Sequence, residues 1–153
     1  MPDISKRLEK AEKLVQKGKL DDAIEEYLGA WREDRSNDPL VEIIAELYLR
    51  QNQAQKCLEC YGYLFDKYAE RNEGPKAIAI YRKLAKLGAQ DAGRMLALAR
   101  LQEKQKPEEA LEAYRTCAQL FLEKDDKLKA LEALRGLVAL EERNPEWHLR
   151  LGE

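Results

Sequence analysis

The sequence is poor in the residues from which most catalytic and metal sites are built. It contains one histidine, His148, and three cysteines among 153 residues. One histidine excludes a histidine-rich metal cage, and an odd number of cysteines does not favour a disulfide framework. Its 8 glycines are too scattered to form a phosphate-binding loop. We therefore expect no metal ion and no cofactor, and we predict that the chain is not an enzyme.

Long apolar segments are missing as well. No run of about 18 apolar residues occurs, so no segment is expected to cross a membrane. The first seven residues carry charge every few positions and do not resemble a secretory signal. Charged residues make up 37% of the chain, apolar residues 44%, and the net charge is −2. This composition predicts a folded, soluble, cytoplasmic protein with the length of one domain.

Apolar residues recur at three- and four-residue spacing along almost the whole chain, whereas strand-type alternation is absent. Helix-ending and helix-starting signals divide this pattern, such as Gly18 after the first helix and Pro39 at the start of the third. The pattern predicts an all-α chain with helices at about residues 4–17, 20–34, 39–51, 54–72, 75–87, 91–104, 107–124 and 125–143.

The last residues, 145–153, predict the first turns of a ninth amphipathic helix that has no partner after it. Such a helix would be a terminal cap or the beginning of a further hairpin in a longer protein. Terminal caps usually carry a polar outer face, and here Trp147 and two leucines would lie open. We therefore expect a truncated longer protein, and the open end is also a possible site of self-association.

The chain contains an internal repeat. After a shift of 53 residues, residues 57–61 match residues 110–114, and residues 76–78 match residues 129–131. After a shift of 34 residues, residues 23–27 match residues 57–61. Matches at the period of a helix pair indicate stacked hairpins, in which each hairpin covers the apolar face of its neighbour.

Residues 18–30, which read GKLDDAIEEYLGA, resemble a tetratricopeptide repeat. That family has a 34-residue helix hairpin with a small residue in its first helix and a small–aromatic–small series in its second. The matching residues are Ala11, Ala23, Tyr27 and Ala30 in the first copy, Ala45, Tyr48, Cys57 and Tyr61 in the second, and Ala110, Tyr114 and Cys117 in the third. Leu98 stands where a small residue is usual.

The resemblance covers nearly the whole chain and implies a right-handed superhelical solenoid of antiparallel helix hairpins. Its repeats would lie at about residues 4–36, 37–88 and 90–143 of a single domain. Extra helices at 75–87 and 127–142 depart from the family pattern and make a three-helix unit.

The resemblance further implies a non-catalytic scaffold, which binds a segment of another protein along a concave groove. In this family the first helix of each pair lines that groove. The equivalent residues here are Leu8, Glu12, Val15, Glu42, Glu46, Leu49, Met95, Ala99 and Gln102. The Lys, Arg and Asn residues with which some members grip a C-terminal carboxylate are absent. The acidic N-terminal part of the groove predicts a partner with cationic residues, and the whole protein would be a cytoplasmic, bacterial regulatory or assembly protein.

Positive charge gathers in the middle of the chain, where residues 75–106 contain eight basic residues and two acidic ones. This basic band consists of Lys76, Arg82, Lys83, Lys86, Arg94, Arg100, Lys104 and Lys106. Three interpretations remain open. The band is made of solvated helix faces paired with acidic neighbours, or it docks an acidic protein segment, or it binds nucleic acid.

The remaining motifs favour structural roles. Cys57 and Cys60 form a CxxC sequence inside a predicted helix, and Cys57 occupies the repeat's small position, so a redox or zinc role is not expected. The recurring Tyr27, Tyr61 and Tyr114 are expected to fill the core, and Trp31 is expected to do the same. A surface or capping role is expected for His148.

Overall fold

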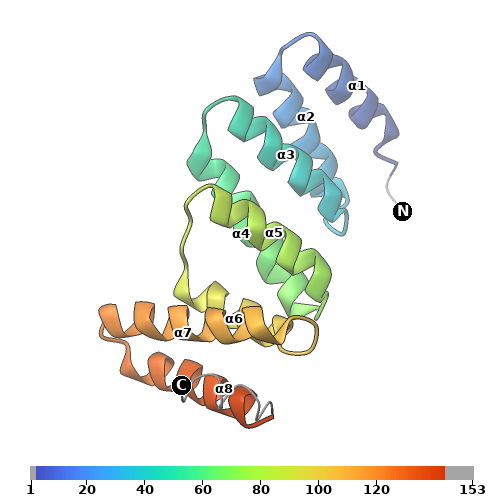
Figure 1. The fold of residues 1–153 in the computed structure, drawn as a ribbon. Coiled ribbons are helices and arrows are strands. Elements are labelled where there is room, and N and C mark those ends of the chain that lie inside the picture. Colours follow the sequence, from blue (N-terminus) through green and yellow to red (C-terminus); the bar gives the residue numbers. More distant parts are fainter. Residues whose placement is uncertain (1–2, 144–153) are drawn as a thin grey trace. The chain divides into compact units, whose positions relative to one another are not determined.

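In the computed structural model, which describes residues 3–143, the chain folds into eight α-helices joined by short turns (Figure 1). They are α1 (Ser5–Gln16), α2 (Leu20–Glu33), α3 (Asp38–Arg50), α4 (Ala54–Glu70), α5 (Gly74–Lys86), α6 (Ala92–Gln102), α7 (Pro107–Glu123) and α8 (Lys127–Arg143). No strand occurs within residues 3–143. The predicted all-α class is therefore confirmed, and the further helix predicted at 145–153 lies outside the described residues.

All eight predicted helices are present, and their ends lie within two residues of the expected positions. The differences have local causes. Asn72 has a φ of 58°, so α4 ends before it rather than including it. The Asp91 side chain accepts a hydrogen bond of 2.9 Å from the backbone N–H of Arg94, so this residue caps α6 instead of belonging to it.

Five of the turns between helices share one backbone geometry. A residue with positive φ follows each of the five helices, namely Gly18, Asn52, Asn72, Gly88 and Asp125. In every case the N–H of the next residue donates to the carbonyl five positions earlier, at 2.8 to 3.1 Å. This pair of features defines the Schellman motif, which satisfies the last carbonyl groups of a helix. The same turn therefore joins consecutive helices at five places in the chain.

Three of these turns place a residue other than glycine in the left-handed region, which is unfavourable for residues with a Cβ atom. We expect Asp125→Gly, at a φ of 58°, to raise the free energy of unfolding by about 0.5–1 kcal/mol. Gly88→Ala, at a φ of 79°, is the reverse change in a turn of the same kind and is expected to lower it by about 1 kcal/mol. Urea unfolding followed by circular dichroism measures both changes. A change of the same sign in the free energy of unfolding for both variants would refute the explanation that the positive φ favours glycine at these turns.

The contacts within the chain divide it into two compact units, Met1–Leu64 and Phe65–Glu153, with the division inside α4. In the first unit α1 packs on α2, and α2 packs on α3 (Figure 1, blue to cyan). Ala11, Ala23 and Ala30 are completely buried between these helices, and Tyr27 is buried beside them. Small residues let helices approach closely, with the aromatic ring filling the adjoining groove.

In the second unit α7 lies between α6 and α8 and packs against both, while α5 contacts α6. Tyr114, which is 1% exposed, occupies the centre of this core. Gly136 of α8 lies directly against its ring, because a Cβ atom built at Gly136 would approach a ring carbon to 2.5 Å. The phenolic hydroxyl donates a hydrogen bond to Glu103, which also forms an ion pair of 3.2 Å with Arg143. The Tyr114 ring is therefore held by α8 at one side and by Glu103 at its hydroxyl.

Burial matches the predicted packing of the repeat. The small residues of the pattern are all completely buried, namely Ala11, Ala23, Ala30, Ala45, Cys57, Ala110 and Cys117. Tyr27, Tyr61 and Tyr114 are buried as well, which confirms their prediction as core residues. Leu98 is also buried, so the leucine at a usually small position is accommodated inside the second unit.

Candidate functional site

Two hollows lie on different faces of α3 in the first unit. The first, with a volume of 390 Å³, lies between α1 and α3 and has Tyr27 of α2 in its wall. It is lined by Glu12, Val15, Gln16, Tyr27, Ile43, Glu46, Leu47 and Arg50. Glu12, Val15 and Glu46 are three of the residues that the sequence predicts for the concave face. The fold therefore brings together residues that are 34 positions apart in the sequence.

The electrostatic character of this hollow, called here the α1–α3 groove, is partly acidic. Burial raises the pKa of Tyr27, and the nearby carboxylate of Glu12 raises it further. Burial also raises the pKa of Tyr61 to about 12, with contributions from Cys57, Glu46 and Glu42. The groove thus has neutral tyrosines in or near its wall and exposed carboxylates at its opening, with Arg50 as the cation among its lining residues.

The remaining residues predicted for the concave face of the first unit lie outside this hollow. Leu8 is half-buried and packs against the core of the unit, and Glu42 is half-buried on α3. Leu49 is 40% exposed. None of these three residues lines the α1–α3 groove.

The structure corrects the predicted concave face of the second unit. Met95, Ala99 and Gln102 are only 9%, 0% and 5% exposed, so their side chains are not available to a partner. The reason is that α6 packs against α7 and also against α5, the third helix of the preceding repeat unit, and that Met95 and Ala99 belong to the core of the second unit. Gln102 is also used internally, because its Nε2 donates to Glu109 at 3.3 Å.

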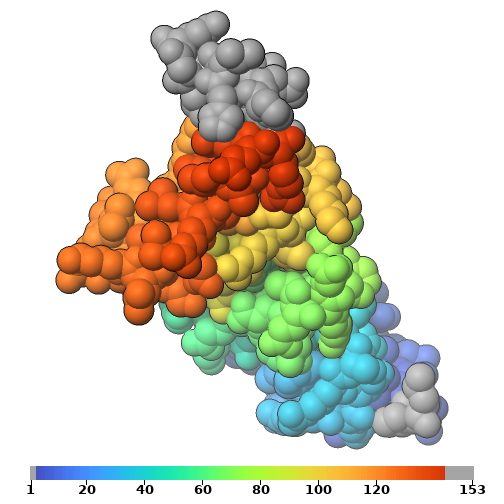
Figure 2. Space-filling view, turned by 90° about the horizontal axis from the view of Figure 1, so that it is seen from below, coloured from blue at the N-terminus to red at the C-terminus, as the bar shows by residue number. Residues whose placement is uncertain are grey.

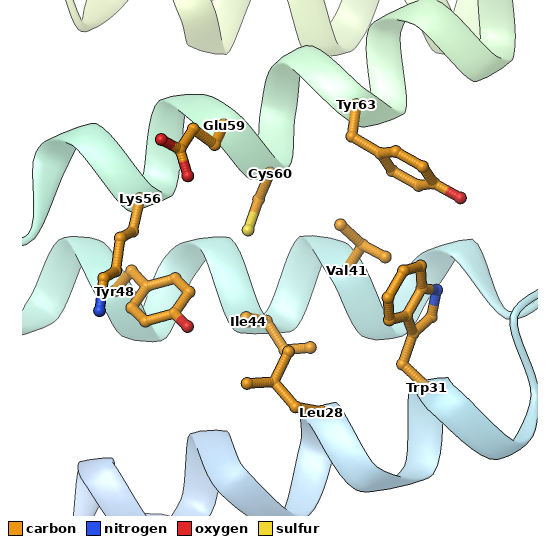
Figure 3. Close-up of a pocket in the computed structure, with 9 residues that line it drawn as sticks. All are labelled: Leu28, Trp31, Val41, Ile44, Tyr48, Lys56, Glu59, Cys60 and Tyr63. Carbon is orange, nitrogen blue, oxygen red and sulfur yellow. The ribbon is translucent and has the colours of Figure 1, made fainter.

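The second hollow of the first unit, with a volume of 310 Å³, lies between α2, α3 and α4 (Figure 3). Its lining is mostly apolar and consists of Leu28, Trp31, Val41, Ile44, Tyr48, Lys56, Glu59, Cys60 and Tyr63. Figure 3 shows the Cys60 thiol between α4 and α3, with Trp31 and Tyr63 at one end and Tyr48 and Lys56 at the other. An apolar hollow with few polar groups is typical of sites that hold an apolar group.

Aromatic contacts form both ends of this apolar pocket. Trp31 and Tyr63 meet edge to face, with ring centroids 5.7 Å apart and an interplanar angle of 85°. At the other end, the ammonium of Lys56 lies 5.5 Å from the ring centroid of Tyr48. The indole Nε1 of Trp31 is buried, and no acceptor lies within hydrogen-bonding distance of it in residues 3–143.

Sequence reasoning missed this pocket because it predicted Trp31 only as a residue that fills the core. Trp31 does pack against the core of the first unit, but it is half-buried, and the guanidinium of Arg35 lies 5.2 Å from its ring centroid. The available signal was the spacing of large side chains on the second helices of two neighbouring hairpins. Leu28 and Trp31 on α2, and Cys60 and Tyr63 on α4, lie three residues apart on faces that turn toward each other.

The CxxC motif has the properties of structural cysteines. Cys57 is completely buried, and Cys60 is half-buried in the wall of the apolar pocket. Burial raises the pKa of the Cys60 thiol to about 11, with smaller contributions from Cys57 and Glu59. Burial also raises the pKa of Cys117 to about 11. A reactive or metal-binding cysteine has the opposite shift, because the thiolate is the reacting form.

Within residues 3–143, no three or more His, Cys, Asp and Glu side chains are grouped so that they could hold a metal ion. The described helices also include none that is both long enough and apolar enough to span a bilayer. The predicted surface role of His148 falls outside the described residues.

Acidic side chains pair with half of the predicted basic band. Arg94 donates from Nε and Nη2 to the two carboxylate oxygens of Asp66, at 3.0 and 3.1 Å. Arg100 pairs with Glu132 at 3.2 Å. Two weaker pairs join Lys76 to Glu73 at 3.7 Å and Lys106 to Glu109 at 3.9 Å. These contacts favour the interpretation of solvated helix faces that meet acidic neighbours.

Three other cations of the basic band form no such ion pairs within residues 3–143. Arg82, Lys86 and Lys104 are exposed and have no ionic partner among residues 3–143. Arg82 and Lys86 lie four residues apart on α5 and therefore share one face of that helix. Such a small group of cations is much less than a duplex-binding surface requires.

Comparison with known proteins identifies no family. No family model matches the chain, and no curated protein matches it. Eight chains of solved structures match, among them one titled "Crystal structure of MamA protein". The alignment to this structure covers 94% of each chain at 17% identity, with a TM-score of 0.37. A TM-score this low does not show that the two chains share a fold.

Proposed function

We propose that the chain is a non-catalytic protein-interaction module of the tetratricopeptide-repeat kind, and that the α1–α3 groove receives a cationic segment of a partner protein. The observation that supports this proposal is the meeting of Glu12, Val15 and Glu46 around one 390 Å³ hollow. The sequence resemblance assigns the same three residues to the surface that such repeats use for partners.

The chemistry of the groove suits a segment that is both apolar and basic. Val15, Ile43 and Leu47 supply apolar contact area, and burying such area drives association. Glu12 and Glu46 stand at the surface, where opposite charge speeds encounter and fixes the orientation of a bound segment. An extended or helical peptide with a Lys or Arg beside an aliphatic residue fits this pattern.

Capture from a lysate of the source cells, with nuclease added, tests the proposal. The native chain serves as bait, and Glu12→Lys/Glu46→Lys serves as the groove variant. We expect a captured protein to be retained about tenfold more weakly by the groove variant, because two attractions become two repulsions. Cross-linking mass spectrometry of the captured complex then identifies the residues of the partner that lie beside α1 and α3.

The matched control is Glu25→Lys/Glu59→Lys. It produces the same change in net charge within the first unit, but neither residue lines the α1–α3 groove: Glu59 borders the apolar pocket, and Glu25 lines a further hollow between α2 and the end of α3. Circular dichroism confirms that each variant is folded. Equal loss of the partner with both variants, or equal retention, would contradict the assignment to the α1–α3 groove. A partner lost only after Arg82→Glu/Lys86→Glu would instead point to the basic face of α5.

A further inference from the structure

Four apolar side chains lie exposed along the outer face of α8, the last helix of the described chain. Leu128, Leu131, Leu134 and Val138 are 83%, 45%, 39% and 50% exposed. At 100° per residue, their spacing places them within a sector of about 120°. Figure 2 shows part of the α8 surface in orange to red. We call these four side chains the α8 stripe.

The other face of α8 is also apolar and is already used. Ala130, Ala133 and Leu140 are buried against the rest of the second unit, and α7 is the helix they pack on. A helix that is apolar on both faces is normally covered on both. Within residues 3–143, nothing covers the stripe.

Charged residues stand at both ends of the stripe and have opposite signs. Lys127 precedes Leu128, and Glu142 follows Val138 by one turn, so both lie on the same face as the stripe. Both side chains are exposed, and neither has an ionic partner in the described part of the chain. They are separated by 15 residues, or about 22 Å along the helix, and so cannot pair within one α8.

These positions are symmetric about the middle of the stripe. Lys127 and Glu142 are equally distant from the point between Leu134 and Arg135, and so are Leu131 and Val138. When two copies of this face meet antiparallel about that point, Lys127 of each copy meets Glu142 of the other. Leu131 likewise meets Val138, and the aliphatic stem of Arg135 covers Leu134. A two-fold interface requires this kind of self-complementary surface.

From this symmetry we propose that the chain self-associates through the α8 stripe, which packs antiparallel against the α8 stripe of a second copy. The stripe supplies the apolar contact, and two Lys127–Glu142 pairs set its orientation and register. A second copy fits better than an unrelated helix, because the same face supplies both members of each pair. The proposal is independent of the α1–α3 groove, since Glu12→Lys/Glu46→Lys leaves α8 unchanged.

Sedimentation equilibrium of the full 153-residue chain, from low to high micromolar concentration, is the test. The native chain is expected to show a mass that rises toward that of a dimer. At low ionic strength, Lys127→Glu and Glu142→Lys are each expected to weaken the dimer about tenfold, because each change places like charges opposite each other twice. Both changes put a favourable charge at a helix end, so neither weakens α8 itself.

Mixing provides the decisive comparison. An equimolar mixture of Lys127→Glu and Glu142→Lys chains restores both pairs between unlike copies and is expected to regain the native dimer affinity. The double variant Lys127→Glu/Glu142→Lys is expected to do the same by itself. A mixture that remains as weak as its components would overturn the antiparallel pairing.

A second pair of variants tests the apolar part. Leu131→Glu is expected to leave a monomer at all concentrations measured. Leu49→Glu, at a side chain of similar exposure in the first unit, is expected to leave the dimer intact. A native chain that sediments as a monomer throughout, or equal loss of the dimer with both variants, would overturn the proposal. A native monomer would direct attention to residues 144–153 or a different protein as the cover of the stripe.

Discussion

Tyr114→Ala is expected to lower the free energy of unfolding by about 3–5 kcal/mol, the largest loss that a single truncation should cause in this chain. The side chain is the largest of those that are completely buried in the described residues. Its ring fills the space between α7 and Gly136 of α8, and the surrounding helices leave little freedom to collapse into the cavity. Urea unfolding followed by circular dichroism measures the loss.

Two companion variants separate ring packing from the hydrogen bond. Tyr114→Phe keeps the ring and removes only the donor to Glu103, which retains its ion pair with Arg143, so a loss of about 1 kcal/mol is expected. Gly136→Ala places a methyl group against the ring and is expected to be much less harmful when combined with Tyr114→Ala. A loss for Tyr114→Ala no larger than for Tyr114→Phe would show that the ring does not anchor this core.

The second large effect concerns the cysteines. At pH 8 we expect the thiols of the folded chain to react with a thiol reagent at least about a hundredfold more slowly than those of the unfolded chain. Cys60 and Cys117 have pKa values of about 11 instead of 9.0, which leaves roughly a hundredfold less thiolate near neutral pH. Burial of Cys57 and Cys117 slows the reagent further. With a reagent that releases a chromophore on reaction with a thiol, the absorbance in native and in denaturing buffer gives the reaction rates of the folded and the unfolded chain.

The same shifts fix the sign of a pH effect on stability. Because folding raises these thiol pKa values, the unfolded chain releases its protons first as the pH rises through 9.0 toward about 11. The folded state should therefore lose stability in this alkaline range, and Tyr61, with a pKa of about 12, adds to the loss.

Variants that keep a single cysteine assign the measured reaction rates with the thiol reagent to individual cysteines. Native thiols that react as fast as unfolded ones would refute the structural role of the CxxC sequence.

The helices could be predicted from the sequence because their ends carry local signals. Gly18 and Gly88 mark turns that need a positive φ, and Pro39 fixes the start of α3. The buried small residues could be predicted equally well, since each recurs at the spacing of the repeat. The positive φ of Asn52, Asn72 and Asp125 was harder to predict, because Asn and Asp also occur in many other backbone conformations.

Which residues lie at the surface depends on contacts between helices, and the local sequence does not indicate these contacts. Glu12 and Glu46 were predicted for one surface and do line one groove, because the first hairpin follows the two-helix pattern. Met95 and Ala99 were predicted for the same kind of surface, but they are buried in the core of the second unit, where α6 packs against both α5 and α7. Trp31 was predicted to fill the core and does pack against it, but its place on the side of α2 that faces α4 also puts it in the wall of a pocket.

The Schellman turns that join most of the helices restrict how the chain can change in length. Four of them leave only three residues between helices, and two backbone hydrogen bonds fix the path of those residues. One inserted residue would break this arrangement, because the two hydrogen bonds that close the turn would no longer join the same residues and the start of the next helix would be displaced. Substitutions are therefore easier to accommodate than insertions or deletions at these turns, and the connections at residues 34–37 and 103–106, which lack a positive φ, are the places where the chain has most freedom to lengthen.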